Sequence, residues 1–194
     1  MQLSTVNVVA SFDLGVTLDL HHIHASNLGF TRYNPIRFSG LTLKLARPRA
    51  SVLLFSTGKA IILGASTVTN ALFGARKAAK HLRSLGYTRC AVNGFSIKNV
   101  VVSARLPYAV NIRQLATNHQ PEAIYEPELF AALVYKLSHP TGKAIIFEKG
   151  LINIVGIDNE QDAWAAAASL EAITSLYRKP STLDSTNPML ASLD

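Results

Sequence analysis

The chain repeats itself at a fixed spacing of 92 residues. The stretch "YNPIRFSGLTLKLARP" at 33–48 returns as "YEPELFAALVYKLSHP" at 125–140, with its tyrosine, its phenylalanine and both prolines in register. The same offset relates three further pairs: Asn7 and Asn99, Phe55 and Phe147, and Gly64 and Gly156. Two copies are too few for a solenoid, in which many repeats stack on one another. We therefore expect two copies of one unit, at 1–90 and 91–180.

Within each copy, the hydrophobic period changes from strand-like to helical. "FSGLTLKLA" alternates as a strand with its leucines on one face, and "SVLLFSTGKAIILGAS" predicts a hairpin closed by a glycine-containing turn. "TNALFGARKAAKHLRSLG" at 69–86 predicts a long helix that ends at Gly86, with a copy at 158–178. Its expected apolar stripe is Leu72, Ala75, Ala79, Leu82 and Leu85. With shorter helices expected at 17–26 and 109–119, the layout is of the α+β class.

Composition bounds the kind of protein. With 48% hydrophobic and 16% charged residues, we expect a folded core, and 181–194 is the segment expected to be disordered. The formal net charge of +7 favours a polyanionic partner, although a basic solvated surface explains it almost as well. The single cysteine, Cys90, allows no intramolecular disulfide, and no apolar run approaches the roughly 20 residues of a membrane span. We expect a soluble intracellular protein with no membrane contact.

One face of the predicted sheet is apolar although a single layer of helices covers only the other face. Its expected members are Val9, Leu53, Phe55, Ile61, Leu63, Val101, Ile145, Phe147 and Val155. An apolar patch of this size left in water usually marks a binding surface. The alternative, which periodicity alone leaves open, is that these residues form the core of a two-sheet sandwich.

The motifs "YNPIRF", "LLFSTGK", "ARKAAKHLRSLGY", "KNVVVS" and "YEPELFAALVYKL" resemble the TATA-box-binding protein family, in that family's order and over about residues 3–180. The resemblance implies a pseudo-two-fold duplicated saddle. In that fold, a curved antiparallel sheet of ten strands places its concave face in the DNA minor groove, and four helices lie on its convex face. A divergent TATA-binding protein and a TATA-binding-protein-related factor fit the motifs equally.

The resemblance also assigns roles to residues of the DNA face. Four phenylalanines would be wedges that insert between base pairs and bend the duplex, as TATA-binding protein itself does; the alternative is four core residues. They are Phe38, Phe55, Phe130 and Phe147. The implied groove floor comprises Asn7, Val9, Leu53, Ile61, Leu63, Asn99, Val101, Ile145, Asn153 and Val155. The implied phosphate contacts are Arg37, Lys44, Arg49, Lys59 and Lys136.

Departures from the family pattern are as informative as the matches. Leu63 and Val155 stand where the family has threonines that donate to the groove, and Asn153 replaces a groove-facing valine. Family lysines are replaced at Ser66, Leu151 and Asp158. The resemblance therefore implies that DNA bending is retained while specificity for the TATA sequence is relaxed.

Partner surfaces follow from the same resemblance. Glu126, Glu128 and Leu129 match the stirrup where transcription factor IIB docks. Arg76, Lys77, Lys80 and Arg83 match the helix face that contacts factor IIA and the repressor NC2, although a solvated basic helix face is the simpler alternative. We expect a nuclear initiation factor of a eukaryote that positions a IIB-type factor and polymerase-associated factors. When free of DNA, it could form a homodimer through the saddle face.

No catalytic or cofactor pattern competes with this interpretation. "HHIH" at 21–24 lacks a cysteine or acidic partner for a metal, Cys90 has no nucleophile signature, and "STGK" lacks the glycines of a phosphate-binding loop. We therefore expect neither a metal, nor a cofactor, nor enzymatic activity. Two alternatives remain: a scaffold of the same fold that has lost most DNA binding, and a nucleic-acid enzyme on a related fold.

Overall fold

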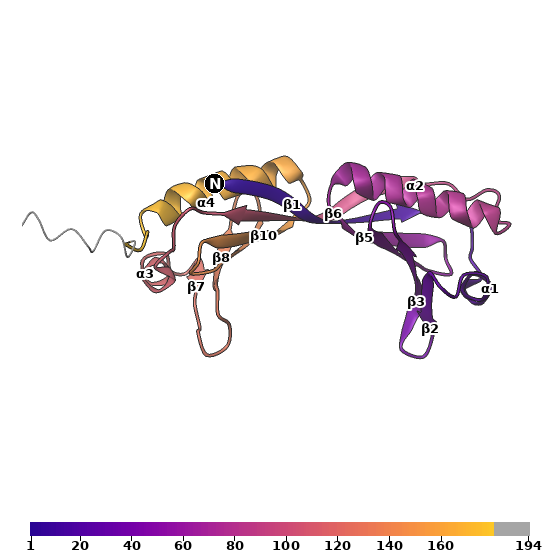
Figure 1. Cartoon of the computed structure of the whole chain (residues 1–194), viewed down its shortest axis with the longest axis horizontal. Coiled ribbons are helices and arrows are strands. Elements are labelled where there is room, and N and C mark those ends of the chain that lie inside the picture. The colour runs from indigo at the N-terminus through magenta and orange to yellow at the C-terminus, as the bar shows by residue number, and fades with distance from the viewer. Residues whose placement is uncertain (181–194) are drawn as a thin grey trace, which may run out of the picture. The chain divides into compact units, whose positions relative to one another are not determined.

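The computed structural model describes residues 1–180, so the predicted disordered tail at 181–194 lies outside the described residues. Within them, ten strands form one sheet in the order β2-β3-β4-β5-β1-β6-β10-β9-β8-β7, accompanied by four helices (Figure 1). The strands are β1 (Gln2–Asp13), β2 (Thr31–Asn34), β3 (Phe38–Leu45), β4 (Ala50–Leu54), β5 (Lys59–Ala65), β6 (Asn93–Arg105), β7 (Ala123–Ile124), β8 (Leu133–Leu137), β9 (Gly142–Ile146) and β10 (Leu151–Ile157). The helices are α1 (Leu20–Ala25), α2 (Val68–Ser84), α3 (Ile112–Asn118) and α4 (Glu160–Ser175). The predicted α+β class is confirmed.

The order of elements is itself duplicated. Strand, short helix, four strands and long helix run from β1 to α2 and run again from β6 to α4. The predicted hairpin is β4 and β5, which pair antiparallel with Leu53 opposite Ile61. All four expected helices are present, and each is shorter than the sequence pattern suggested.

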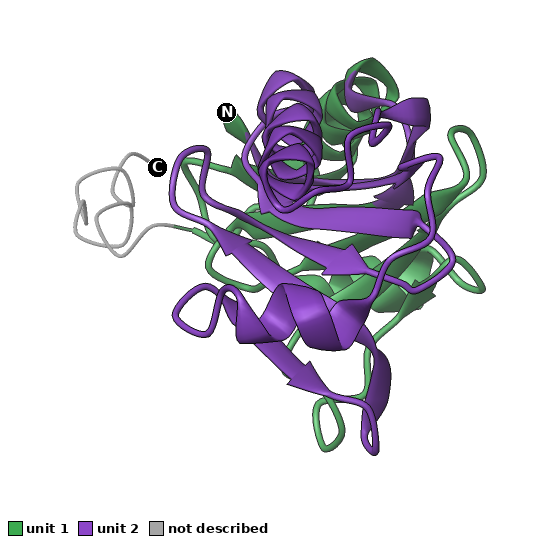
Figure 2. Cartoon of the chain, turned by 90° about the vertical axis from the view of Figure 1, so that its right-hand side faces the viewer, with its two compact units in different colours: residues 1–4, 103–155, 161–194 green, residues 5–102, 156–160 purple. Residues whose placement is uncertain are grey.

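The chain forms two compact units, shown in purple and green in Figure 2. One comprises Thr5–Val102 with Gly156–Glu160, and the other comprises Met1–Ser4, Ser103–Val155 and the chain from Gln161 onward. Most of β1 and the first part of β6 therefore belong to the same unit. The repeat boundaries at 90 and 91 stay a prediction.

Each strand buries one face. In β1, Val8, Ala10 and Phe12 are buried, whereas the residues between them are half-buried. Helix α2 covers the buried side of β3, β4 and β5, and the two layers share one apolar cluster. None of the described helices is long and apolar enough to span a bilayer.

The buried stripe of α2 is made of small residues: Ala71, Gly74, Ala75, Ala78, Ala79 and Leu82. The predicted stripe is correct at Ala75, Ala79 and Leu82 but wrong at its ends, because Leu72 and Leu85 are only half-buried. Leu85 is the C-cap residue and so lies beyond the helix, and the small residues of the stripe let α2 approach the sheet closely, since a Cβ on Gly74 would lie 2.6 Å from Ile62 Cδ1. The predicted helix stop is confirmed, since Gly86 follows the C-cap residue with φ +100°.

The β4–β5 and β9–β10 hairpins each turn at a glycine. Gly58 and Gly150 have φ +88° and +81°, the left-handed region that favours glycine. A Cβ on Gly58 would lie 2.2 Å from the Val16 carbonyl oxygen, and one on Gly150 would lie 2.4 Å from that of Tyr108. These corners hold Phe55 and Phe147, whose N–H groups donate to the carbonyls of Lys59 and Leu151.

We expect Gly58→Ala and Gly150→Ala each to lower the free energy of unfolding by more than about 1 kcal/mol, because left-handed strain adds to a backbone clash. Gly29→Ala is the matched control, since nothing lies within 4 Å of its added Cβ. Denaturant unfolding of the three variants measures the difference. Equal stability of all three would contradict the corner role.

Candidate nucleic-acid interface

The side of the sheet away from the helices is half-exposed in each unit; we call it the open face. In the first unit, Leu53 lies opposite Ile61 and Ile61 lies opposite Ser11. In the second, Ile145 lies opposite Asn153, and Val155 lies on the same side two residues further on. Every predicted groove-floor residue is half-buried and has at least one buried chain neighbour. The two-sheet sandwich alternative is wrong, because the described strands form one sheet.

The predicted wedges occur as two aromatic pairs. The ring centroids of Phe38 and Phe55 are 5.8 Å apart and those of Phe130 and Phe147 are 6.4 Å apart, both edge to face. Phe38 and Phe130 are each 46% exposed, which excludes a core role for these two. Edge-to-face stacking within each pair holds the exposed ring against its half-buried partner.

The space beneath the two pairs differs. A Cβ on Gly40 would lie 2.6 Å from the Phe38 ring and 3.1 Å from the Phe55 ring, so the first pair uses the room that glycine leaves. The equivalent residue 92 positions later is Ala132, which is buried. In the second unit, the Glu126 carbonyl accepts from the N–H groups of Leu129 and Phe130 and thereby fixes the turn that carries the exposed ring.

Two asparagines on neighbouring strands make the same hydrogen bond. Asn7 Oδ1 accepts from the Gly64 N–H at 2.8 Å, and Asn99 Oδ1 accepts from the Gly156 N–H at 2.8 Å. The pairing of β1 with β5 shifts by one residue beside Gly64, so this glycine lies in a β-bulge with φ +84°. The side chain supplies the acceptor that the bulged N–H lacks in the ladder, which explains an asparagine inside a strand. Because each Oδ1 is engaged, each Nδ2 is left as a donor on the open face.

The predicted phosphate contacts lie at the surface. Lys44, Lys59 and Lys136 extend from strands, whereas Arg37 and Arg49 belong to turns, and all five are exposed. Sequence reasoning missed Lys143, which is exposed and lies directly opposite both Lys136 and Val155. The alternation that places Ile145 and Phe147 on the open face places Lys143 there as well, and the register of β8, β9 and β10 then shows which residues it lies opposite.

The basic face of α2 is not wholly free for a partner. Lys77 Nζ donates to the Arg47 carbonyl and Arg83 Nη1 donates to the Cys90 carbonyl, both at 2.6 Å. Arg76 and Lys80 are exposed. A purely solvated helix face therefore describes only part of this cluster. Cys90 is buried, and burial raises the pKa of its thiol, so it stays protonated at neutral pH.

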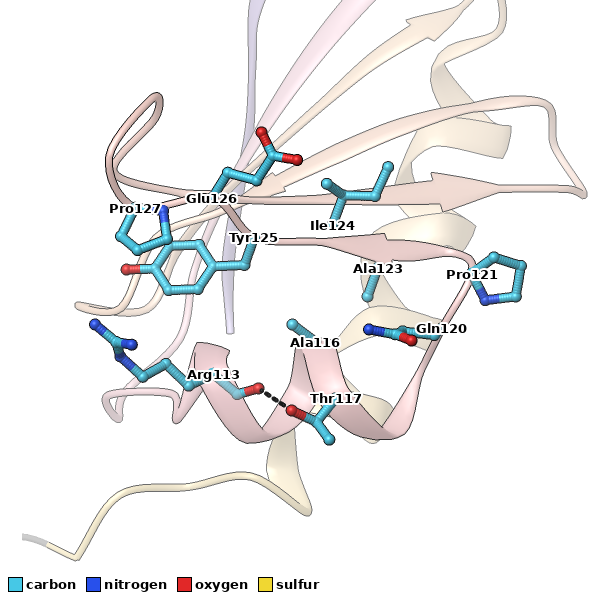
Figure 3. A pocket seen from close by; sticks show the side chains of 10 residues that line it. All are labelled: Arg113, Ala116, Thr117, Gln120, Pro121, Ala123, Ile124, Tyr125, Glu126 and Pro127. Carbon is cyan, nitrogen blue, oxygen red and sulfur yellow. Dashed lines mark hydrogen bonds between the residues drawn. The ribbon is translucent and has the colours of Figure 1, made fainter.

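The predicted IIB surface borders an open pocket of about 540 Å³ between α3 and β7 (Figure 3). Glu126 and Pro127 line one end, and Tyr125 lies beside Arg113, whose guanidinium carbon is 5.8 Å from the ring centroid. Glu128 and Leu129 lie next along the turn, and both are exposed. Arg113 and the exposed Ile124 were not predicted, since neither belongs to a recognisable motif.

Two of the three histidines of "HHIH" contact neighbouring side chains. His24 Nδ1 lies 2.8 Å from Thr31 Oγ1, and the His21 ring meets the Tyr33 ring edge to face. Among residues 1–180, no group of three or more histidine, cysteine or acidic side chains could hold a metal ion.

We expect Asn99→Leu to lower the free energy of unfolding by about 1 kcal/mol, because the Gly156 N–H loses its acceptor. Asn99→Asp is the matched control, since its carboxylate still accepts that hydrogen bond. The same contrast should hold at Asn7, and denaturant unfolding measures both. If the leucine and aspartate variants were equally stable, the hydrogen bond would not explain the asparagines.

Comparison with known proteins agrees with this architecture. The family described as "Transcription factor TFIID (or TATA-binding protein, TBP)" matches residues 2–85 and 94–175. "TATA box-binding protein-like 2" of Rattus norvegicus is 33% identical over 89% of this chain, which spans 50% of that relative's length. The TATA-box-binding protein of Saccharomyces cerevisiae is 30% identical over 89% of this chain and 71% of its own. The solved structure of Methanococcus jannaschii TBP is 31% identical, with a TM-score of 0.78 over 91% of this chain and 99% of that one. With this fold and a family match across both copies of the repeat, the chain belongs to the TATA-binding protein family.

Proposed function

We propose that this chain is a transcription initiation factor that binds the minor groove of promoter DNA and bends it, without catalysis and without a cofactor. The observation that carries the proposal is the open face, with its two equivalent pairs of edge-to-face phenylalanines. An apolar surface of this kind suits the minor groove, whose floor offers few hydrogen-bonding sites. The exposed rings of Phe38 and Phe130 suit insertion into a base step.

We expect energy transfer between dyes at the two ends of a short TATA-containing duplex to rise when the protein binds. Phe38→Ala and Phe130→Ala should reduce that rise, because each removes an exposed wedge. Phe73→Ala is the matched control: this phenylalanine is 59% exposed on α2 and lies away from the open face. If all three variants bent the duplex as the unmodified protein does, the two rings would not be wedges.

Specificity for TATA should be relaxed at the centre of the site. An aliphatic side chain at Leu63 or Val155 leaves a base acceptor without a partner once water is expelled, at a cost of about 1–3 kcal/mol whichever base pair is present. The Nδ2 groups of Asn7 and Asn99 still offer donors, because their Oδ1 atoms are held by glycine N–H groups. Wedge insertion retains its preference for flexible steps at the ends of the site.

Leu63→Thr with Val155→Thr should raise the ratio of affinities for a TATA site over a centrally G·C-substituted site by roughly thirtyfold, at about 1 kcal/mol for each of the two restored hydrogen bonds. The control is Leu63→Val in the native Val155 background, which has the same shape without hydroxyls. Titrations at one fixed salt concentration measure the ratio. If the unmodified protein already discriminated as strongly as the threonine variant, the hydroxyls would be irrelevant.

The partners of this factor are proposed from two surfaces. The turn of Glu126, Glu128 and Leu129, with the adjacent pocket, suits a IIB-type factor. The exposed Arg76 and Lys80 on α2 suit an acidic partner of the IIA or NC2 kind. A nuclear location belongs to the same proposal.

A further inference from the structure

The two repeats differ sharply in charge. Residues 1–90 hold eleven basic and two acidic side chains, a net charge of +9, whereas residues 91–180 hold eight of each and carry no net charge. Three of the first repeat's predicted phosphate contacts have uncharged counterparts 92 positions later. Arg37, Arg49 and Lys59 correspond to Leu129, Thr141 and Leu151. Lys136, the counterpart of Lys44, is the only predicted phosphate contact of the second repeat.

The second repeat has a lysine pair that the first repeat lacks. Lys136 on β8 lies directly opposite Lys143 on β9, and Lys143 lies directly opposite Val155 on β10. At the equivalent positions of the first repeat, Lys44 lies opposite Ser51, and Ser51 lies opposite Leu63. Both lysines of the pair are exposed, and their place beside Val155 puts them on the open face.

Directly opposite residues of antiparallel strands have Cβ atoms about 4.5–5.5 Å apart, and like charges there destabilise the sheet. A polyanion that lies against the open face would remove this penalty. We propose that Lys136 and Lys143 together form a phosphate-binding site for the DNA backbone, one that only the second repeat possesses. The inference rests on the proposed function and adds to it Lys143, which lies outside the motifs that resemble the family.

The repeats supply the matched variants, because each position can take the residue of its counterpart. Lys143→Ser removes the pair, Ser51→Lys builds one in the first repeat, and Lys143→Gln keeps a long uncharged side chain. Lys98→Ser is the control, since this exposed lysine neighbours Asn99 on β6 and therefore projects from the helix side. The readouts are the dependence of duplex-DNA affinity on salt and the melting temperature of the free protein at low salt.

Each phosphate contact contributes about 0.9 to the slope of log K against log salt. We expect Lys143→Ser and Lys143→Gln to reduce the slope by about that amount and Ser51→Lys to increase it. Lys98→Ser should leave it unchanged. Free of DNA, Lys143→Ser should melt at a higher temperature than the unmodified protein, since a like-charge pair is gone. Weaker DNA binding together with greater stability cannot arise from a damaged fold.

An unmodified protein that binds DNA, with a slope that Lys143→Ser and Lys143→Gln leave unchanged, would overturn this inference alone. An unmodified protein without salt-dependent DNA affinity would overturn the proposed function, and the inference with it.

Discussion

Helices cover only one side of a sheet that is apolar on both sides. In β1, Val8, Ala10 and Phe12 are buried, while Asn7 and Val9 remain half-exposed. Burying an apolar side chain contributes about 1.5–3 kcal/mol, and this chain leaves a row of such contributions unused in its free state. The covered side must therefore supply most of the stabilising burial. The small residues of α2 allow the close packing that this requires. The open face can then keep a composition suited to a partner.

The duplication constrains the backbone more tightly than the side chains. Gly58 and Gly150 make the same corner, and Gly64 and Gly156 have φ angles of +84° and +83° with the same asparagine bond. Lys59 and Leu151, by contrast, have diverged although they follow those corners at equivalent positions. A side chain added at either corner would collide with the carbonyl of another segment, so these glycines cannot change without moving that segment. Exposed side chains can change freely, and the charge difference between the repeats lies at exposed positions.

Much of the fold could be predicted from the sequence because its signals are periodic or repeated. The β4–β5 hairpin, the Gly86 helix stop and the order of elements all follow from such signals. The ends of the α2 stripe could not be predicted, since the packing of Ile62 against Gly74 depends on how closely helix and sheet approach. For the site, the wedge and asparagine positions came from the repeat and from family motifs. The bulge that gives Asn7 its structural purpose depends on strand register, as does the place of Lys143 directly opposite Lys136. The intramolecular bonds of Lys77 and Arg83 likewise depend on where chain segments meet.

The exposed apolar side chains also give the open face a distinct heat-capacity signature. Apolar surface in water raises the heat capacity, so any partner that covers this face should bind with a negative heat-capacity change. Lysine contacts with phosphate respond to salt, through the release of counterions. Temperature and salt therefore act on different parts of the same surface. Calorimetry at several temperatures measures the heat-capacity change of binding. It can therefore distinguish burial of the phenylalanines and aliphatic residues from attraction by the basic residues around them.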